Sequence, residues 1–262
     1  MIIYCEEEVH AIKRSNQIVA KILEELGSMI KPGVRTRELD EHAEARTREM
    51  GAIPAFKGYR DFPSSLCTSI NEEIVHGIPS SRALREGDII SLDFGVLYEG
   101  YYGDAAVTFP VGEITPKAKK LIQAAKEAFH KGLEQARAGN RLSDISYAIQ
   151  AYVEAQGFSV IRSFVGHGIG LSLHEEPQIP NFGLPGRGPK IKPGMVFALE
   201  PMIAMGDWNV EILEDNWTAI TRDKSLSAHY EHTVAITEDG AEILSELDKK
   251  EASPFLKENR YA

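Results

Sequence analysis

The feature of this chain that most constrains its fold is a set of landmarks that recurs at a nearly constant distance along the sequence. Four pairs share an offset of 106 or 107 positions: Gly33 and Gly139, Gly51 and Gly157, Gly87 and Gly194, and Asp93 and Glu200. This period is too long for solenoid repeats, which run about 20–50 residues. We therefore expect two related halves that face each other across a pseudo-twofold axis.

Each half is expected to begin with two helices. Apolar residues recur at spacings of three and four through residues 6–30, which predicts a one-sided helix. A second helix is expected from Thr36, as its N-cap, to Met50. In the second half, Thr115 and Pro116 have the form of an N-cap and a first-turn proline that open a further helix.

Extended segments follow the helices of the first half at residues 65–70 and 88–94. Helices followed by strands predict an α+β fold, with an antiparallel-rich sheet, helices outside it, and the functional site between the two halves. The expected organisation is a single domain over residues 1–262, with half-repeats at about 9–110 and 115–244 and a polar, loosely held tail at 245–262.

Composition narrows the classes of function. The chain has 29 Lys and Arg against 39 Asp and Glu, which argues against nucleic-acid binding because phosphate contacts need clustered cations. Its 2 cysteines are too few for a disulfide framework. The first residues lack the form of a signal peptide, and no segment approaches the roughly 18 apolar residues of a membrane span. A cytoplasmic protein without membrane association is expected.

Four carboxylates stand in strand-like apolar sequence, where burying an unpaired charge costs several kcal/mol. Asp93 and Asp104 flank a turn at residues 98–100, so a hairpin can bring them opposite each other. Glu200 is the counterpart of Asp93 by the repeat offset, and Glu231 is the candidate counterpart of Asp104 across a longer, inserted segment. Each alone could be a turn or edge-strand charge, but four together would repel one another unless cations stood between them.

Two divalent cations would balance four carboxylates. Oxygen-rich ligation without a thiolate favours Mn, Fe(II), Co or Zn in a dinuclear site, with the ions about 3.5–4 Å apart. His167 is a further candidate ligand, because Gly166, Gly168 and Gly170 let the backbone turn closely around it. A structural histidine is the alternative for this position.

Two other histidines are candidates for function. His174 could donate a hydrogen bond to a substrate oxygen, and His76 precedes Gly77 in a similar turn-like segment. An ordinary turn residue is the alternative for each. The chain has no complete dinucleotide fingerprint, Walker-type loop, zincin motif or nucleophile elbow. The remaining histidines are expected to be solvated: His10, His42, His130, His229 and His232.

Four segments, in the order DFGVLYEGYYGD, GHGIGLSLHEEP, FALEPM and SAHYEHTVAIT, strongly resemble the type I methionine aminopeptidases. The resemblance extends from about Val9 to Leu244 and implies the pita-bread fold in a single catalytic domain. It implies a hydrolase that removes the N-terminal initiator methionine from nascent proteins and peptides, preferably before a small second residue. The first helix begins at once, so a bacterial-type enzyme without an N-terminal extension is implied.

The resemblance also implies roles for the site residues. Asp104 and Glu231 would bridge two divalent metal ions (Co, Mn, Fe or Zn), Asp93 would chelate one ion, and His167 with Glu200 would bind the other. A metal-bridging hydroxide would then attack the first peptide carbonyl, with Glu200 moving its proton.

The family pattern assigns contacts with the substrate as well. His174 would hydrogen-bond the developing oxyanion, and His76 would contact the peptide. The methionine pocket would be formed by Tyr59, Phe62, Cys67, Leu173 and Trp217. The family often has tyrosine where Phe62 stands and phenylalanine where Leu173 stands, so the pocket is expected to be slightly altered.

Two alternatives remain open. A proline-directed aminopeptidase of the same fold usually has a separate N-terminal domain, and a non-catalytic pita-bread binding protein would have lost metal ligands. The family's substrates imply a transient association with the ribosome. Residues 201–221 contain Asp207, Glu211, Glu214 and Asp215 and no Lys or Arg, which argues against docking of this segment on ribosomal RNA. A monomer is expected.

Overall fold

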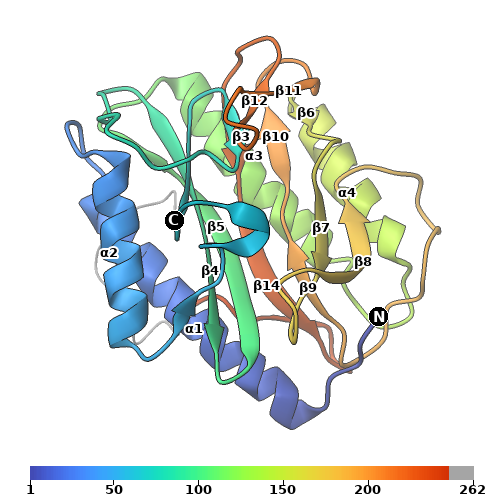
Figure 1. Ribbon diagram of the computed structural model, residues 1–262. Coiled ribbons are helices and arrows are strands. Elements are labelled where there is room, and N and C mark those ends of the chain that lie inside the picture. Colours follow the sequence, from blue (N-terminus) through green and yellow to red (C-terminus); the bar gives the residue numbers. More distant parts are fainter. Residues whose placement is uncertain (248–262) are drawn as a thin grey trace.

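The computed structural model describes residues 1–247, and it combines helices with a curved, mostly antiparallel sheet (Figure 1). The helices are α1 (Glu6–Met29), α2 (Thr36–Glu49), α3 (Pro116–Leu133) and α4 (Leu142–Ala155), with one 3-10 turn, η1 (Tyr59–Asp61). The strands of the first half are β1 (Ile53–Pro54), β2 (Cys67–Ile70), β3 (Glu73–Val75), β4 (Ile89–Tyr98) and β5 (Tyr101–Pro110). Those of the second half are β6 (Ser159–Val160), β7 (Val165–Gly168), β8 (Glu175–Pro180), β9 (Val196–Leu199), β10 (Met202–Ala204), β11 (Val210–Ile212), β12 (Ala219–Thr221), β13 (Ser227–His229), β14 (Glu231–Ile236) and β15 (Ala241–Ile243). The α+β prediction is confirmed.

Side-chain caps explain where the helices begin. The predicted start of α3 is confirmed, because the Thr115 hydroxyl accepts a hydrogen bond from a backbone N–H of the first turn at 3.2 Å. The predicted N-cap of α2 is wrong by one residue. Arg35 is the N-cap, and its backbone N–H donates to Glu38 Oε2 at 2.7 Å. The Thr36 hydroxyl instead accepts from the backbone N–H of Ser80 at 2.8 Å, so it fastens the helix to a later loop.

The repeat in the sequence corresponds to repeated geometry. Helix α2 spans positions 36 to 49 and α4 spans 142 to 155, so both ends are shifted by 106, as are the two residues of β1 and β6. The repeated glycines have positive φ angles that are similar within each pair: 93° and 92° at Gly33 and Gly139, 75° and 83° at Gly51 and Gly157, and 89° and 83° at Gly87 and Gly194. A Cβ disfavours this conformation, which explains glycine at these turns. One supersecondary unit is therefore used twice.

One nine-stranded sheet spans both halves, in the order β1–β4–β5–β14–β9–β7–β8, with β2 paired to β4 and β15 to β14. Strands β4 and β5 form the predicted hairpin, closed by Glu99 and Gly100, which both have positive φ. The halves join where β5 pairs with β14, with Glu231 opposite Ala106. Two three-stranded sheets, β13–β10–β6 and β11–β12–β3, flank this main sheet. The seam between the halves thus runs through the centre of the main sheet.

Each half has a hydrophobic core between its helices and the sheet. In the first half, Ile22 and Leu26 of α1 pack with Phe94 of β4. In the second half, Phe129 of α3 and Ile145 of α4 pack with the apolar side chains of β9 and β14. Figure 1 shows α1, α3 and α4 behind the strands and α2 at the side of the molecule, next to α1. The opposite face of the sheet remains available for the site.

The predicted polar tail at 245–262 lies mostly outside the described residues. Its first residue, Ser245, is 3% exposed, and its hydroxyl lies 2.8 Å from His232 Nδ1. The expectation of a loosely held chain is therefore wrong at Ser245, because this side chain satisfies a buried imidazole. Within residues 1–247, the helices lack the combination of length and apolar character needed to cross a bilayer.

Candidate active site

Strand register brings the first-half carboxylates onto one face of the main sheet. Asp93 of β4 pairs with Ala106 of β5, and Ala106 pairs with Glu231 of β14. Asp104 lies two residues before Ala106. Because side chains on a strand alternate between faces, Asp93, Asp104 and Glu231 project from the same side of the sheet.

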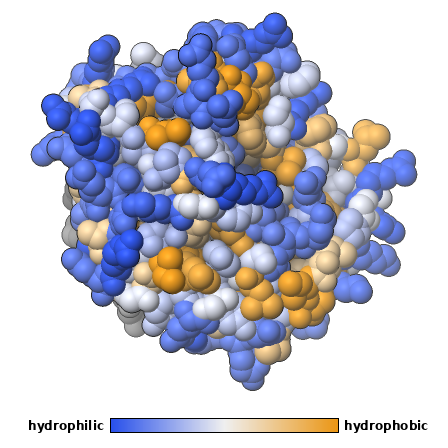
Figure 2. All heavy atoms as spheres, viewed as in Figure 1, coloured by the Kyte–Doolittle hydropathy of each residue, from blue (hydrophilic) through white to orange (hydrophobic). Residues whose placement is uncertain are grey.

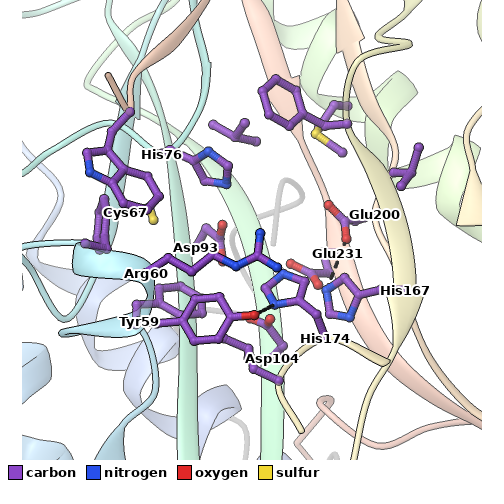
Figure 3. Close-up of a pocket in the computed structure, with 18 of the residues that line it drawn as sticks. Tyr59, Arg60, Cys67, His76, Asp93, Asp104, His167, His174, Glu200 and Glu231 are labelled. Atoms are coloured by element: carbon purple, nitrogen blue, oxygen red, sulfur yellow. Dashed lines mark hydrogen bonds and ion pairs between the residues drawn. The ribbon is translucent and has the colours of Figure 1, made fainter. Parts of the chain in front are cut away.

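The second half reaches the same face by the same alternation. Thr233 of β14 pairs with Ala198 of β9, which pairs with His167 of β7. Glu231 lies two residues before Thr233, and Glu200 lies two residues after Ala198. Figure 3 shows Glu200, Glu231 and His167 converging from one side on Asp93 and Asp104. The five predicted ligands therefore come together from five adjacent strands of the sheet, β4, β5, β14, β9 and β7, with Glu200 directly after the end of β9.

Asp104, Glu200 and Glu231 are buried, and Asp93 is half-buried. Asp104 is 4% exposed and Glu231 is 2% exposed. Burial raises the pKa of Asp93 to about 7, and burial together with neighbouring carboxylates raises the pKa of Asp104, Glu200 and Glu231 well above its usual range. Within residues 1–247, Oδ1 of Asp93 and Oδ1 of Asp104 have no hydrogen-bond partner. Cations beside these oxygens would balance the buried charge.

His167 adds a neutral imidazole to this cluster. Its Nδ1 lies 2.9 Å from the carbonyl oxygen of Gly168, and a carbonyl can only accept, so Nδ1 carries the ring proton and Nε2 presents its lone pair. Burial lowers the pKa of His167 to about 4, which keeps the ring neutral at pH 7. One ligand atom each from Asp104, His167 and Glu231 lie within 4.8 Å of one another. Carboxylate oxygens with one imidazole fit Mn, Fe(II), Co or Zn.

A cavity of about 390 Å³ opens beside the carboxylates. Figure 2 shows the corresponding face of the molecule hollowed near its centre, with hydrophobic patches around the hollow. Every residue predicted for the site lines this cavity: Tyr59, Phe62, Cys67, His76, Asp93, Asp104, His167, Leu173, His174, Glu200, Trp217 and Glu231. The residues that the sequence assigned to one site thus all line a single cavity in the structure.

Part of the cavity wall is apolar. The rings of Phe62 and Trp217 meet edge to face, with centroids 5.1 Å apart, and Leu173 is 2% exposed. Burial, followed by the charge of Asp93, raises the pKa of the Cys67 thiol, so this cysteine is a small wall residue and a poor nucleophile. These walls suit an apolar side chain.

The two predicted functional histidines both lie on the cavity wall. His174 Nδ1 is 2.9 Å from the Tyr59 hydroxyl, and the two rings stack with centroids 5.2 Å apart. The ring of His174 also lies beside that of His167, at 4.2 Å between centroids. His76 has a left-handed backbone, with φ 61°, and its ring meets the edge of Phe164 at 5.4 Å. Burial lowers the pKa of His76 to about 4, so it is neutral near pH 7.

Two histidines predicted to be solvated are buried. His229 is 1% exposed, and its Nε2 lies 3.9 Å from a Glu200 oxygen and 3.8 Å from a Glu231 oxygen. His232 is 8% exposed and is held by the hydroxyls of Ser245 and Tyr230. The prediction is wrong because β13 and β14 are packed inside the molecule, where every residue of both strands is buried.

Several wall residues were not indicated by the sequence: Phe56, Arg60, Val75, Ser163, Phe164, Val165, Gln178 and Met202. Arg60 stands between Tyr59 and Phe62, and Val75 precedes His76, so adjacency to predicted residues was the available signal. Gln178 on β8 and Met202 on β10 line the cavity because of the order of the strands in the sheets, which the sequence does not reveal.

Comparison with known proteins identifies the family. A profile described as Metallopeptidase family M24 matches residues 10–238 of the chain. The chain belongs to this family. This M24 metallopeptidase is therefore a hydrolase, and the prediction of a divalent metal cofactor is confirmed at that level by the family and by the ligand cluster.

Relatives with known names align with nearly the whole chain. The M24 metallopeptidase is 53% identical over 240 residues to "Methionine aminopeptidase 1" of Bacillus subtilis, covering 92% of this chain and 97% of the relative. It is 53% identical over 246 residues to a methionine aminopeptidase of Clostridium acetobutylicum, covering 94% and 98%. The resemblance seen in the sequence motifs is confirmed.

Solved structures confirm the pita-bread fold. A methionine aminopeptidase from Thermotoga maritima matches with a TM-score of 0.93 and 44% identity, covering 94% of this chain and 100% of that one. A prolidase from Pyrococcus furiosus matches with a TM-score of 0.76 and 26% identity, covering 95% of this chain but 66% of the prolidase. The M24 metallopeptidase thus shares its fold with both kinds of enzyme, and more of its sequence with the first.

Proposed function

We propose that this chain removes the N-terminal initiator methionine from nascent proteins and peptides, preferably when the second residue is small. The observation that carries the proposal is one cavity in which a carboxylate and imidazole cluster adjoins an apolar end formed by Phe62, Leu173 and Trp217. Such an end suits the long, unbranched methionine side chain. Relatives named methionine aminopeptidase, aligned over more than nine tenths of the chain, support it.

Five side chains would hold two divalent metal ions: Asp93, Asp104, His167, Glu200 and Glu231. Asp104 and Glu231, on the paired strands β5 and β14, are the candidates to contact both ions. The bound ions would supply Lewis-acid polarisation and a water of lowered pKa. Their positive charge would also let the buried carboxylates ionise.

The protein's own side chains are suited to handle protons and orient the peptide. Glu200 lines the cavity with an oxygen 3.4 Å from His167 Nε2, where its carboxylate could take up a proton during the reaction. When the Tyr59 hydroxyl donates to Nδ1 of His174, the ring proton sits on Nε2, which can then donate to the developing oxyanion. His76, on the opposite wall, is placed to contact the peptide.

Hydrolysis of Met-Ala-Ser by protein reconstituted with each metal in turn tests the proposal. We expect release of methionine, and we expect His167→Ala to abolish it while leaving the circular dichroism spectrum unchanged. His10→Ala, at an exposed position of α1, is the matched control and should behave as wild type. Faster cleavage of Ala-Pro-Ala would assign a proline-directed enzyme instead. Failure of the folded protein to bind any divalent ion would favour a non-catalytic binding protein.

We also propose that the half-repeats at 9–110 and 115–244 act as a single catalytic domain, as a cytoplasmic monomer with transient contact to the ribosome. Each half supplies two of the four carboxylates, so neither half expressed alone should bind metal at the site. Sedimentation at micromolar concentration should give the mass of one chain. The acidic segment 201–221 argues that any ribosomal contact lies elsewhere.

A further inference from the structure

The turn from Gly58 to Phe62 holds an arginine in a backbone conformation that arginine rarely adopts. Arg60 has φ 48° and ψ 35°, and Asp61 has φ 69°, both in the left-handed region that a Cβ disfavours. Backbone hydrogen bonds close the turn, from Gly58 N–H to the Phe62 carbonyl at 2.8 Å and from Phe62 N–H to the Tyr59 carbonyl at 3.0 Å. Strain kept within an ordered turn is typical of a functional position.

The guanidinium of Arg60 lies at the mouth of the cavity. It lines that cavity, with Cζ 5.4 Å from the centroid of the Tyr59 ring. Figure 3 shows the side chain crossing in front of the carboxylates toward His174. Within residues 1–247, Arg60 has no ion-pair partner, whereas Lys57 in the same segment pairs with Glu44 at 2.6 Å. Arg60 is therefore a cation that a ligand in the mouth can reach.

An extended peptide bound in the cavity would bring its third residue near this cation. Under the proposed function, the first side chain occupies the apolar end near Phe62 and Trp217, and the scissile carbonyl lies near His174. In an extended chain, residues one and three project to the same side, about 7 Å apart, while residue two projects to the other side. Tyr59 and Arg60 line the same cavity as Phe62 and Trp217, so a third residue on that side would reach the guanidinium.

We propose that Arg60 is a specificity-determining residue that selects peptides with Asp or Glu at the third position. The planar guanidinium presents paired N–H donors that match a carboxylate, and stacking on Tyr59 holds it ready. Because the contact is open to water, the expected preference is about fivefold, the upper range for an exposed ion pair. This inference rests on the proposed removal of N-terminal methionine.

The test compares kcat/KM for Met-Ala-Glu-Ser, Met-Ala-Gln-Ser and Met-Ala-Lys-Ser with metal-loaded enzyme. We expect the Glu peptide to exceed the Gln peptide about fivefold and the Lys peptide to be slowest. The Glu to Gln ratio should fall toward one at about 1 M salt, where the screening length is about 3 Å. Ratios taken within one enzyme preparation cancel differences in folding and metal content.

Arg60→Gln should bring the ratio of kcat/KM for the Glu and Gln peptides to about one. Arg60→Gly should have the same effect on this ratio. Because glycine tolerates the left-handed backbone, Arg60→Gly should also keep the melting temperature at or above that of wild type. Lys57→Gln is the matched control, because Lys57 is already paired with Glu44, and its ratio should remain that of wild type. Equal rates for the three peptides, or an unchanged ratio in Arg60→Gln, would overturn the inference alone. If none of the peptides were cleaved, the proposed function would fail and the inference with it.

Discussion

The two halves of the molecule share a frame and differ in how they complete the site. In the first half, Asp93 and Asp104 stand on one uninterrupted hairpin, β4–β5, closed by a two-residue turn. In the second half, Glu200 and Glu231 are separated by the chain that forms β10 to β13. That inserted chain gives Trp217 to the cavity wall. The shared frame thus presents two carboxylates from each half, and the longer connection in the second half adds Trp217 to the apolar wall.

Removing one carboxylate from each half should test whether the halves contribute equally to the metal cluster. We expect Asp104→Asn and Glu231→Gln each to lower kcat/KM by well over about 100-fold, since losing a mere hydrogen-bond partner of a metal ligand already costs 10–100-fold. Both should also lower the bound metal measured by atomic emission. Glu242→Gln, in an exposed ion pair with Lys13, is the control. Full activity in one of the two variants would show that the halves are not equivalent.

Most of the frame and the site could be predicted from the sequence, for a physical reason. Left-handed turns favour glycine, so Gly33 and Gly139 reveal the repeat, and buried carboxylates such as Asp104 contrast sharply with the apolar strand sequence around them. The hairpin between Asp93 and Asp104 followed from a local turn. Local signals of this kind survive in a single sequence.

What could not be predicted depends on contacts between distant segments. In the sequence, His229 and His232 are polar residues that flank a glutamate. They are buried only because β13 pairs with β10 and β14 pairs with β9. Ser245 was assigned to the tail because its partner, His232, is remote in sequence. Arg60 carries no family or composition signal, and its place at the cavity mouth depends on the η1 turn. Each of these is a consequence of tertiary packing.

Without metal, the stability of the protein should fall as the pH rises, because of buried carboxylates in both halves. The pKa of Asp93 is about 7 in the folded chain against an ordinary value of 3.8, so between these pH values the unfolded chain gives up a proton that the folded chain keeps. In the metal-free protein, the contribution of this group to stability is complete below about pH 4 and is lost as pH rises through about 7. The slope is at most about 1.4 kcal/mol per pH unit for each such group.

Thermal melts from pH 4.5 to 8 in chelator, and again with excess divalent metal, measure this dependence. The melting temperature should fall with rising pH in chelator and should not fall with metal, because bound cations favour the ionised carboxylates. Asp93→Asn and its counterpart Glu200→Gln should each reduce the slope in chelator. A flat curve for metal-free wild type would contradict the shared burial of charge in the two halves.

The first turns of α2 and α4 offer a pair of matched caps that differ in one bond. Glu38 Oε2 accepts the backbone N–H of Arg35 at 2.7 Å, and Asp144 Oδ2 accepts that of Arg141 at 2.8 Å. Asp144 Oδ1 also accepts the backbone N–H of Gly186 at 2.7 Å. We expect Glu38→Ala to lower the free energy of unfolding by about 1 kcal/mol and Asp144→Ala by about 2 kcal/mol. Urea denaturation measures both, and equal losses would mean that the bond to Gly186 adds nothing.

The smallest effect, and the strictest test of equivalence, comes from the first repeated glycine pair. Gly33 and Gly139 have φ 93° and 92°, and a Cβ added at either would meet no atom within 4 Å. Their backbone N–H groups donate to equivalent carbonyls, of Leu84 at 2.8 Å and of Ile191 at 3.1 Å. Alanine at either position loses about 1–2 kcal/mol to the left-handed backbone and regains about 0.4–1 kcal/mol from a less flexible unfolded chain.

Gly33→Ala and Gly139→Ala should therefore each lower the free energy of unfolding by about 1 kcal/mol, within about 0.5 kcal/mol of each other, and the double variant should lose the sum because the sites share no partner. Urea denaturation of the metal-loaded protein measures the three values. A large difference between the single variants would mean that equal backbone angles do not carry equal strain, so that the two halves, alike in geometry, respond to strain differently.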